Sequence, residues 1–175
     1  MMCWVTNMTP LALLLTCSLL VGSAYAESNE CKESDSVDAW SALTSSPGGT
    51  FLLVNSTKTK PKDCLQGTAP GSPTKPSLNV TMKFKQDGQW TTTNWNFNIE
   101  GNKITSTLGE RTLKGTMLYD GDSHKCHVNQ LESGEVELWK LKDSDGGGMD
   151  CCRSVFDKKK GDKPVKNPQE NGCSD

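Results

Sequence analysis

The residues with the greatest potential for chemistry gather between positions 126 and 152. Cys126 is followed by His127 on one expected strand, Trp139 lies on the next, and Cys151 and Cys152 are adjacent at the start of a short polar helix. A disulfide between such a strand and such a helix would fix the helix against the outside of a sheet. Histidine and tryptophan then offer polar and aromatic groups for holding a small molecule on the other side. The pattern therefore favours binding over catalysis.

Catalytic and metal chemistry find little support elsewhere in the chain. The sequence has no nucleophile-elbow motif and no phosphate-cradling loop, and each cysteine of an exported chain is expected to be paired. His124 and His127 flank Cys126 closely enough to suggest a metal site, but residues three apart on one strand face opposite sides of the sheet. We therefore expect no enzymatic activity, no cofactor and no metal.

The orientation of the side chains near Cys126 follows from the alternation of residues along a strand. If Cys126 bonds to the outer helix, its side chain points away from the interior and the next side chain points inward. The inward residues of this strand and the following one are then His127, Asn129, Leu131, Glu137, Trp139 and Leu141, and the apolar wall comprises Leu78, Val80, Phe84 and Trp95. Buried histidine and asparagine side chains need hydrogen-bonding partners. They form either a satisfied core network or the polar part of a ligand pocket.

Alternation of apolar and polar residues predicts that most of the chain forms short strands. Turn residues at positions 120–121 (Asp-Gly) and 133–134 (Ser-Gly) favour hairpins and an all-β, up-and-down antiparallel barrel. Two helices flank this barrel: residues 34–36 (Ser-Asp-Ser) offer a cap to the first, and the second covers residues 151–160. The expected strands cover residues 51–56, 78–84, 95–99, 104–108, 112–119, 124–131 and 136–141.

Residues 1–26 are typical of a secretory signal. The apolar run over residues 11–22 is too short to span a membrane as a stable helix, and Ala24 and Ala26 provide small residues at the cleavage positions, although no basic residue precedes the run. The remaining residues 27–175 fit one domain with a single core. We therefore expect a secreted, monomeric protein that is free of the membrane.

Export implies that the cysteines form disulfides. Six cysteines remain after the signal, and an even number implies three bridges, with 15 possible pairings. Cys151 and Cys152 are expected to reach different partners, because a bridge between adjacent cysteines is strained. Asn55 and Asn79 begin glycosylation sequons that an exported chain can use. The net charge of −2 argues against nucleic-acid binding, and the lysines at 158–160 fit a solvated helix end.

Several segments of the chain match one known family when they are considered together. They are residues 37–40, 62–65, Phe84, Trp95, 119–128, 137–139 and the pair Cys151 and Cys152. In these segments the chain resembles the tick salivary lipocalins of the histamine-binding protein family, most closely the soft-tick moubatin and complement-inhibitor group. The resemblance covers essentially the whole chain after the signal. It implies an eight-stranded lipocalin barrel with a short N-terminal helix and a C-terminal helix, closed by the disulfides Cys31–Cys151, Cys64–Cys173 and Cys126–Cys152.

The resemblance also implies that the barrel captures a small host mediator in saliva. Lipid-binding relatives bury eicosanoids such as leukotrienes or thromboxane, which would suppress platelet aggregation and inflammation. Amine-binding members carry an aspartate where this chain has His127, so capture of histamine or serotonin is an alternative that would depend on Glu137 and Asn129. Inhibition of complement component five through the outer surface is a further alternative, although the loop 143–150 is glycine-rich.

Transfer of the family's binding residues by position gives a candidate ligand set. Lys62 stands where a leukotriene-binding relative offers an arginine to the ligand carboxylate, and lysine keeps the charge but lacks the bidentate geometry. Gly115 stands where that relative has another arginine, although Lys114 is adjacent. The residues that would meet hydroxyl groups of the ligand are Thr93, His127 and Asn129. The lipid tail would lie among Leu43, Phe51, Leu65, Leu78, Val80, Phe84, Trp95 and Trp139.

Overall fold

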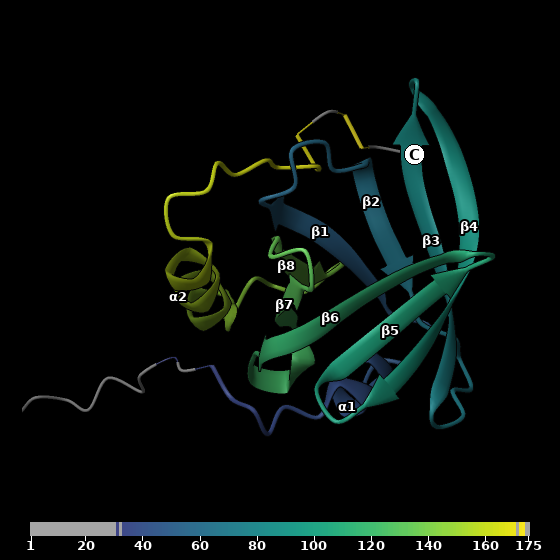
Figure 1. Cartoon of the computed structure of the whole chain (residues 1–175), viewed down its shortest axis with the longest axis horizontal. Helices are drawn as coiled ribbons and strands as arrows, with labels where there is room; N and C mark the ends of the chain where they lie inside the picture. Colours follow the sequence, from purple (N-terminus) through teal and green to yellow (C-terminus); the bar gives the residue numbers. More distant parts are fainter. Residues whose placement is uncertain (1–30, 32, 171, 174–175) are drawn as a thin grey trace, which may run out of the picture. The chain divides into compact units, whose positions relative to one another are not determined.

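Eight antiparallel strands close into a barrel in which each strand pairs with its neighbour in the chain and β8 returns to pair with β1 (Figure 1). The computed structural model describes residues 31, 33–170 and 172–173. The strands are β1 (Thr50–Ser56), β2 (Asp63–Thr68), β3 (Ser77–Gln86), β4 (Gln89–Glu100), β5 (Lys103–Leu108), β6 (Arg111–Asp120), β7 (Cys126–Leu131) and β8 (Val136–Leu141). This order confirms the all-β, up-and-down barrel.

The strands differ most from the predicted ones at three places. β4 begins at Gln89, well before the predicted start at residue 95. β2 has no counterpart among the predicted strands, because its sequence Asp-Cys-Leu-Gln-Gly-Thr does not alternate between apolar and polar residues. The prediction of a strand over residues 124–131 is wrong at its start, since β7 begins at Cys126. The residues before it form a 3₁₀ turn, η1 (Asp122–His124), in which Ser123 and His124 adopt left-handed φ angles of 57° and 56°. Those angles interrupt the extended chain.

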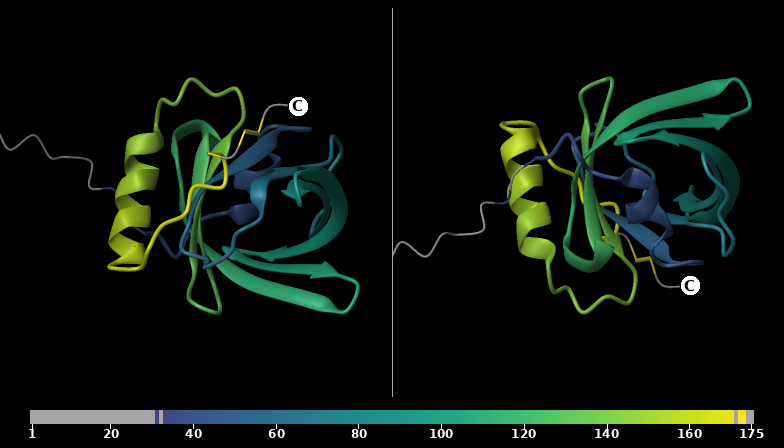
Figure 2. Two further views of the ribbon diagram at one scale, coloured as in Figure 1. Left: turned by 90° about the horizontal axis from the view of Figure 1, so that it is seen from above. Right: turned by 90° about the horizontal axis from the view of Figure 1, so that it is seen from below.

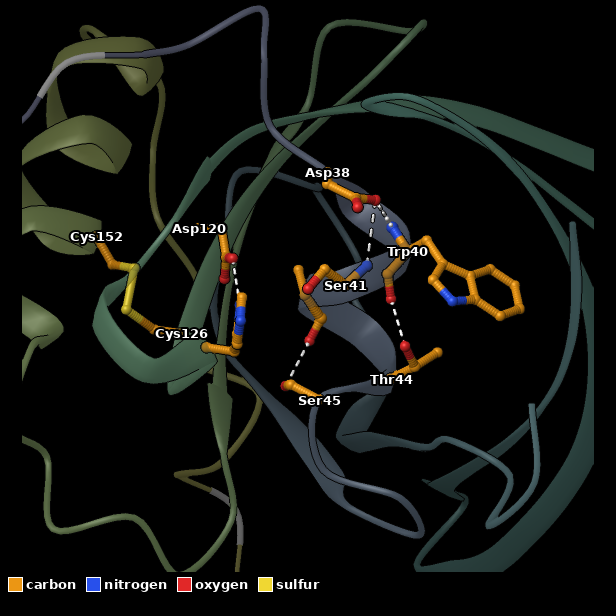
Figure 3. Close-up of polar contacts among 10 residues, drawn as sticks. Asp38, Trp40, Ser41, Thr44, Ser45, Asp120, Cys126 and Cys152 are labelled. Atoms are coloured by element: carbon orange, nitrogen blue, oxygen red, sulfur yellow. Dashed lines mark hydrogen bonds and ion pairs between the residues drawn. A yellow bond between two sulfur atoms is a disulfide. The ribbon is translucent and has the colours of Figure 1, made fainter. Parts of the chain in front are cut away.

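The helix α1 (Ala39–Thr44) lies at one end of the barrel, inside the curve of the strands (Figure 3). Its N-cap is Asp38, whose Oδ1 accepts hydrogen bonds from the backbone N–H groups of Trp40 at 3.0 Å and Ser41 at 3.2 Å. The prediction of a cap within residues 34–36 is therefore wrong, because the helix begins only after Asp38. The helix buries three residues in the barrel: Ala39, Ala42 and Leu43.

The helix α2 (Met149–Lys160) packs on the outside of the barrel against β7 and β8 (Figure 2). A disulfide between Cys126 of β7 and Cys152 of α2 fixes it there. The turn before β7 accommodates this bridge only with glycine, since a Cβ at Gly121 would lie 2.4 Å from Cys126 Sγ. The three disulfides are Cys31–Cys151, Cys64–Cys173 and Cys126–Cys152, which confirms every expected pairing.

The C-terminal tail completes the barrel wall between β1 and β2. These strands pair only from Thr50 to Leu52, and beyond that point they separate. Lys166 forms a β-bridge with Ser56 on one side of the gap, and the backbone N–H of Cys64 donates to Pro168 O at 2.8 Å on the other. The Gln169 amide spans the gap, because its Nε2 donates to Leu53 O at 3.0 Å and to Leu65 O at 3.1 Å. The tail, yellow in Figure 1, crosses β1 and β2 in this region.

The proposed signal segment, residues 1–26, lies outside the described residues. Of the helices that the structure does describe, none has both the length and the apolar character needed to cross a lipid bilayer.

Candidate ligand-binding cavity

The barrel contains a cavity of about 810 Å³. Its lining comes from all eight strands, from α1 and from the connection between β1 and β2 at residues 57–62. Alternation along the strands explains this lining, because every second side chain points inward. Small-molecule pockets measure roughly 300–1,000 Å³, so the cavity is large enough to enclose a drug-sized guest.

The structure brings most of the candidate ligand residues together around this cavity. Eleven of the twelve line it: Leu43, Phe51, Lys62, Leu65, Val80, Phe84, Thr93, Trp95, His127, Asn129 and Trp139. Leu78 is the exception, because it is only 1% exposed and packs with α1 in an apolar cluster. The other members of that cluster are Ala39, Ala42, Leu43, Val80, Ile99, Ile104 and Met117.

Neighbouring residues of β7 face opposite sides of the barrel wall, as the alternation predicts. Cys126 and Val128 face outward and pack with α2. The inward residues of β7 and β8 that line the cavity are His127, Asn129, Leu131, Glu137 and Trp139. Leu141 also packs with the inward cluster of Phe51, Leu53 and Trp139, but it does not line the cavity.

Two buried polar atoms at the cavity have no hydrogen-bonding partner among the described residues: His127 Nδ1 and Asn129 Oδ1. The His127 ring lies between aromatic side chains, with its centroid 4.8 Å from that of Phe51 and 6.1 Å from that of Trp139, on which it stacks. Burial lowers the pKa of His127 to about 3, so the imidazole is neutral at physiological pH. Unpaired buried polar groups are costly, and here they offer hydrogen bonds to a guest.

A buried ion pair occupies another part of the cavity. Glu137 is 5% exposed, and its Oε1 lies 2.9 Å from Lys58 Nζ. Its other carboxylate oxygen, Oε2, accepts a hydrogen bond from Trp139 Nε1 at 3.1 Å. Lys58 was not among the candidate residues, because it lies in the irregular connection after β1, where alternation does not determine which way a side chain points.

Basic side chains dominate the charged lining of the cavity. Five of the lining residues are basic: Lys58, Lys60, Lys62, Arg111 and Lys114. All except Lys58 are exposed, which places them at the opening. Lys62 Nζ lies 5.0 Å from the centroid of the Phe84 ring and donates to Gln86 Oε1 at 3.2 Å. Lys60 and Arg111 extend the positive charge that the sequence had indicated at Lys62 and Lys114.

The two histidines near Cys126 have separate environments. His124 Nδ1 lies 2.5 Å from Asp120 Oδ2, and this pair does not line the cavity, whereas His127 does. Burial raises the pKa of Asp120, and the hydrogen bond from His124 opposes that rise. Among the described residues, no group of three or more His, Cys, Asp or Glu side chains is placed to hold a metal ion.

The two sequons differ in accessibility. Asn79 is exposed on β3, where its Oδ1 accepts from Asn96 Nδ2 at 3.2 Å. Asn55 is half-buried within β1. Glycosylation of either residue stays a prediction.

Comparisons with known proteins agree with this architecture. No family model matches the chain. Moubatin from Ornithodoros moubata is 40% identical over 152 residues, which cover 86% of this chain and 88% of moubatin. The chain belongs to the tick salivary lipocalins. A crystal structure of AM182 in complex with serotonin matches this lipocalin with a TM-score of 0.65 and 24% identity, over 77% of this chain and 90% of that one. At that identity the likeness supports the fold alone.

Membership in this family indicates which kind of activity to expect of the chain. Tick salivary lipocalins are secreted proteins, and lipocalins bind small ligands. A ligand-binding role for this lipocalin therefore agrees with its family and with the cavity.

Proposed function

We propose that this lipocalin is secreted in saliva and sequesters a host eicosanoid, a leukotriene or a thromboxane, and so suppresses platelet aggregation and inflammation. The composition of the cavity carries the proposal. Its interior is apolar and aromatic, five basic side chains line it, and the carboxylate of Glu137 is the only one among the described lining residues. Because Lys58 already pairs with Glu137, the unbalanced charge at the opening is positive. An apolar chain ending in a carboxylate complements this arrangement.

The apolar chain of the ligand dominates the expected affinity. Burial of a ten-carbon tail contributes roughly 8 kcal/mol, at about 0.8 kcal/mol for each CH₂ group. A hydrogen bond to a charged group contributes about 1.5–3 kcal/mol. The apolar wall, which includes Val80, Phe84 and Trp95, therefore provides most of the binding free energy, and the polar residues select the head group.

Lys62 is the basic residue best placed to meet the carboxylate. Its ammonium lies beside the Phe84 ring at the boundary between the apolar wall and solvent, and Gln86 Oε1 occupies one of its donors. A ligand carboxylate can take the place of that neutral acceptor. Deeper in the cavity, the unpaired atoms of His127 and Asn129 are available for hydroxyl groups along the chain.

Binding of an eicosanoid is tested by titrating the protein with leukotriene B4 and with a stable thromboxane analogue. We expect heat release in calorimetry and a change in tryptophan fluorescence, because Trp95 and Trp139 line the cavity. Absence of both signals with every eicosanoid tested would contradict the proposal.

The head-group assignment needs a matched pair of variants. We expect Lys62→Gln to weaken binding of the free acid about ten- to a hundredfold. Lys103→Gln removes one positive charge from β5 outside the cavity lining and should leave the affinity unchanged. The methyl ester of the same eicosanoid should bind the wild-type protein and Lys62→Gln equally. If Lys62→Gln and Lys103→Gln bind the free acid with equal affinity, Lys62 does not contact the ligand carboxylate.

A further inference from the structure

Glu137 has the properties of a site for a protonated amine. It is the one carboxylate among the described cavity-lining residues, and it is only 5% exposed. One aromatic ring contacts it directly, because Trp139 Nε1 donates to its Oε2, and that ring stacks on His127, which lies beside Phe51. A buried carboxylate attracts an ammonium group through charge, and the neighbouring aromatic rings can add cation–π interactions.

Lys58 already fills that site. Its Nζ lies 2.9 Å from Glu137 Oε1, at the distance of a charge-assisted hydrogen bond. Together with Trp139 Nε1 at Oε2, this contact gives each carboxylate oxygen a donor. The Lys58 side chain is 29% exposed and comes from the connection after β1, not from a strand of the wall. The ammonium therefore reaches the cavity from the connection between β1 and β2.

We propose that Lys58 is a specificity-determining residue: its ammonium occupies the amine site at Glu137 and thereby restricts the cavity to neutral and anionic ligands. A free amine has to displace a tethered group of the same chemistry, and the tether gives that group an effective concentration in the millimolar range. An amine that binds Glu137 no more tightly than the lysine ammonium loses this competition at lower concentrations. The inference rests on the proposed use of the cavity for ligands, but it concerns amines and is tested without an eicosanoid.

Removal of Lys58 should convert the cavity into one that binds amines. Lys58→Met keeps the approximate length and apolar stem of the side chain but removes the ammonium. We expect this variant to bind serotonin at least tenfold more tightly than the wild-type protein in calorimetric titration. The matched control is Lys60→Met, because Lys60 also lines the cavity but has no ion pair with Glu137. The double variant Lys58→Met with Glu137→Gln should lose the gain.

Folding of the variant needs its own check, since removal of Lys58 leaves a buried carboxylate without its partner. Near-ultraviolet circular dichroism establishes whether the tertiary structure is retained. For a weakened variant, n-butylamine provides a second measurement: it should raise the melting temperature of Lys58→Met more than that of the wild-type protein, because it replaces the missing ammonium.

Three results would overturn the inference. The first is a folded Lys58→Met variant that binds serotonin no better than the wild-type protein. The second is the same stabilisation of both proteins by n-butylamine. The third is tight serotonin binding by the wild-type protein that disappears in Glu137→Gln, since Lys58 would then not exclude amines. Failure of eicosanoid binding by the wild-type protein would contradict only the proposed function, because none of these experiments uses an eicosanoid.

Discussion

Cys126 and His127 are consecutive residues whose side chains lie on opposite faces of β7. The Cys126 sulfur is bonded to Cys152 of α2 outside the barrel, and the His127 ring lies inside, 4.8 Å from that of Phe51. One peptide unit therefore connects the outer helix to the cavity. The outward side chains of β7 hold the barrel together, and the inward ones face the cavity.

Removal of the Cys126–Cys152 bridge should weaken the barrel. We expect the double variant Cys126→Ser and Cys152→Ser to lose about 2–4 kcal/mol of unfolding free energy, because the unfolded chain is no longer constrained by the cross-link. Urea denaturation followed by tryptophan fluorescence measures this loss. A denaturation midpoint equal to that of the wild-type protein would show that α2 is held by packing alone.

Stability should fall on mild acidification because of His127. The pKa of His127 is lowered to about 3 in the folded protein, whereas an unfolded histidine titrates near 6.5. Between these values the unfolded chain binds a proton that the folded chain does not, so stability is lost as the pH falls from about 6.5 towards 3. The slope from this residue is at most about 1.4 kcal/mol for each pH unit.

The variant His127→Phe isolates that contribution. All carboxyl groups are common to both proteins, so the difference between their unfolding free energies, measured from pH 7 to pH 4, reports the histidine. We expect the wild-type protein to lose stability more steeply on acidification than the variant. Parallel pH profiles would contradict the buried, neutral state of His127.

Leu78 and Phe84 should respond differently to truncation, although both lie on β3. Leu78→Ala should lower the unfolding free energy by about 2–5 kcal/mol and leave ligand affinity unchanged, because Leu78 packs against α1 away from the cavity. Phe84→Ala should weaken binding of an apolar ligand, because the ring lines the cavity. Denaturation and calorimetry on both variants give the comparison. Loss of ligand affinity in Leu78→Ala would place that residue within the binding site after all.

Gln169 should stabilise the barrel more than its position near the C-terminus suggests. Gln169→Leu removes the donor shared by Leu53 O and Leu65 O, and unpaired backbone carbonyls should cost about 1–3 kcal/mol. Gln89→Leu is the control, because Gln89 is exposed at the start of β4. Thermal or urea unfolding measures both variants. Equal stability of the two would show that water replaces the Gln169 amide without cost.

The sequence predicted the interior of the barrel well where residues alternate along a strand. The inward orientation of His127 and Trp139 follows from one assumption, that Cys126 bonds outward, and the structure confirms both that bond and the two orientations. Alternation alone misplaced Leu78, since it specifies a face of the sheet but not the height along the barrel at which α1 fills the space.

Alternation along a strand does not predict the orientation of residues outside the regular strands. Lys58 enters the cavity from a connection, and nothing in the spacing of residues 57–62 indicates which lysine turns inward. His124 was predicted on a strand, but the left-handed angles of Ser123 and His124 place it in a turn beside Asp120. Such conformations depend on contacts made across the fold and not on neighbours in the chain.

The gap between β1 and β2, which the C-terminal tail fills, has a consequence for the order in which the barrel forms during synthesis. Gln169 and Cys173 act on strands that are translated more than a hundred residues earlier. The gap between the two strands therefore cannot be closed until residues 166–173 have been synthesised. Until then the wall between β1 and β2 is incomplete, and the cavity of the growing chain is open on that side.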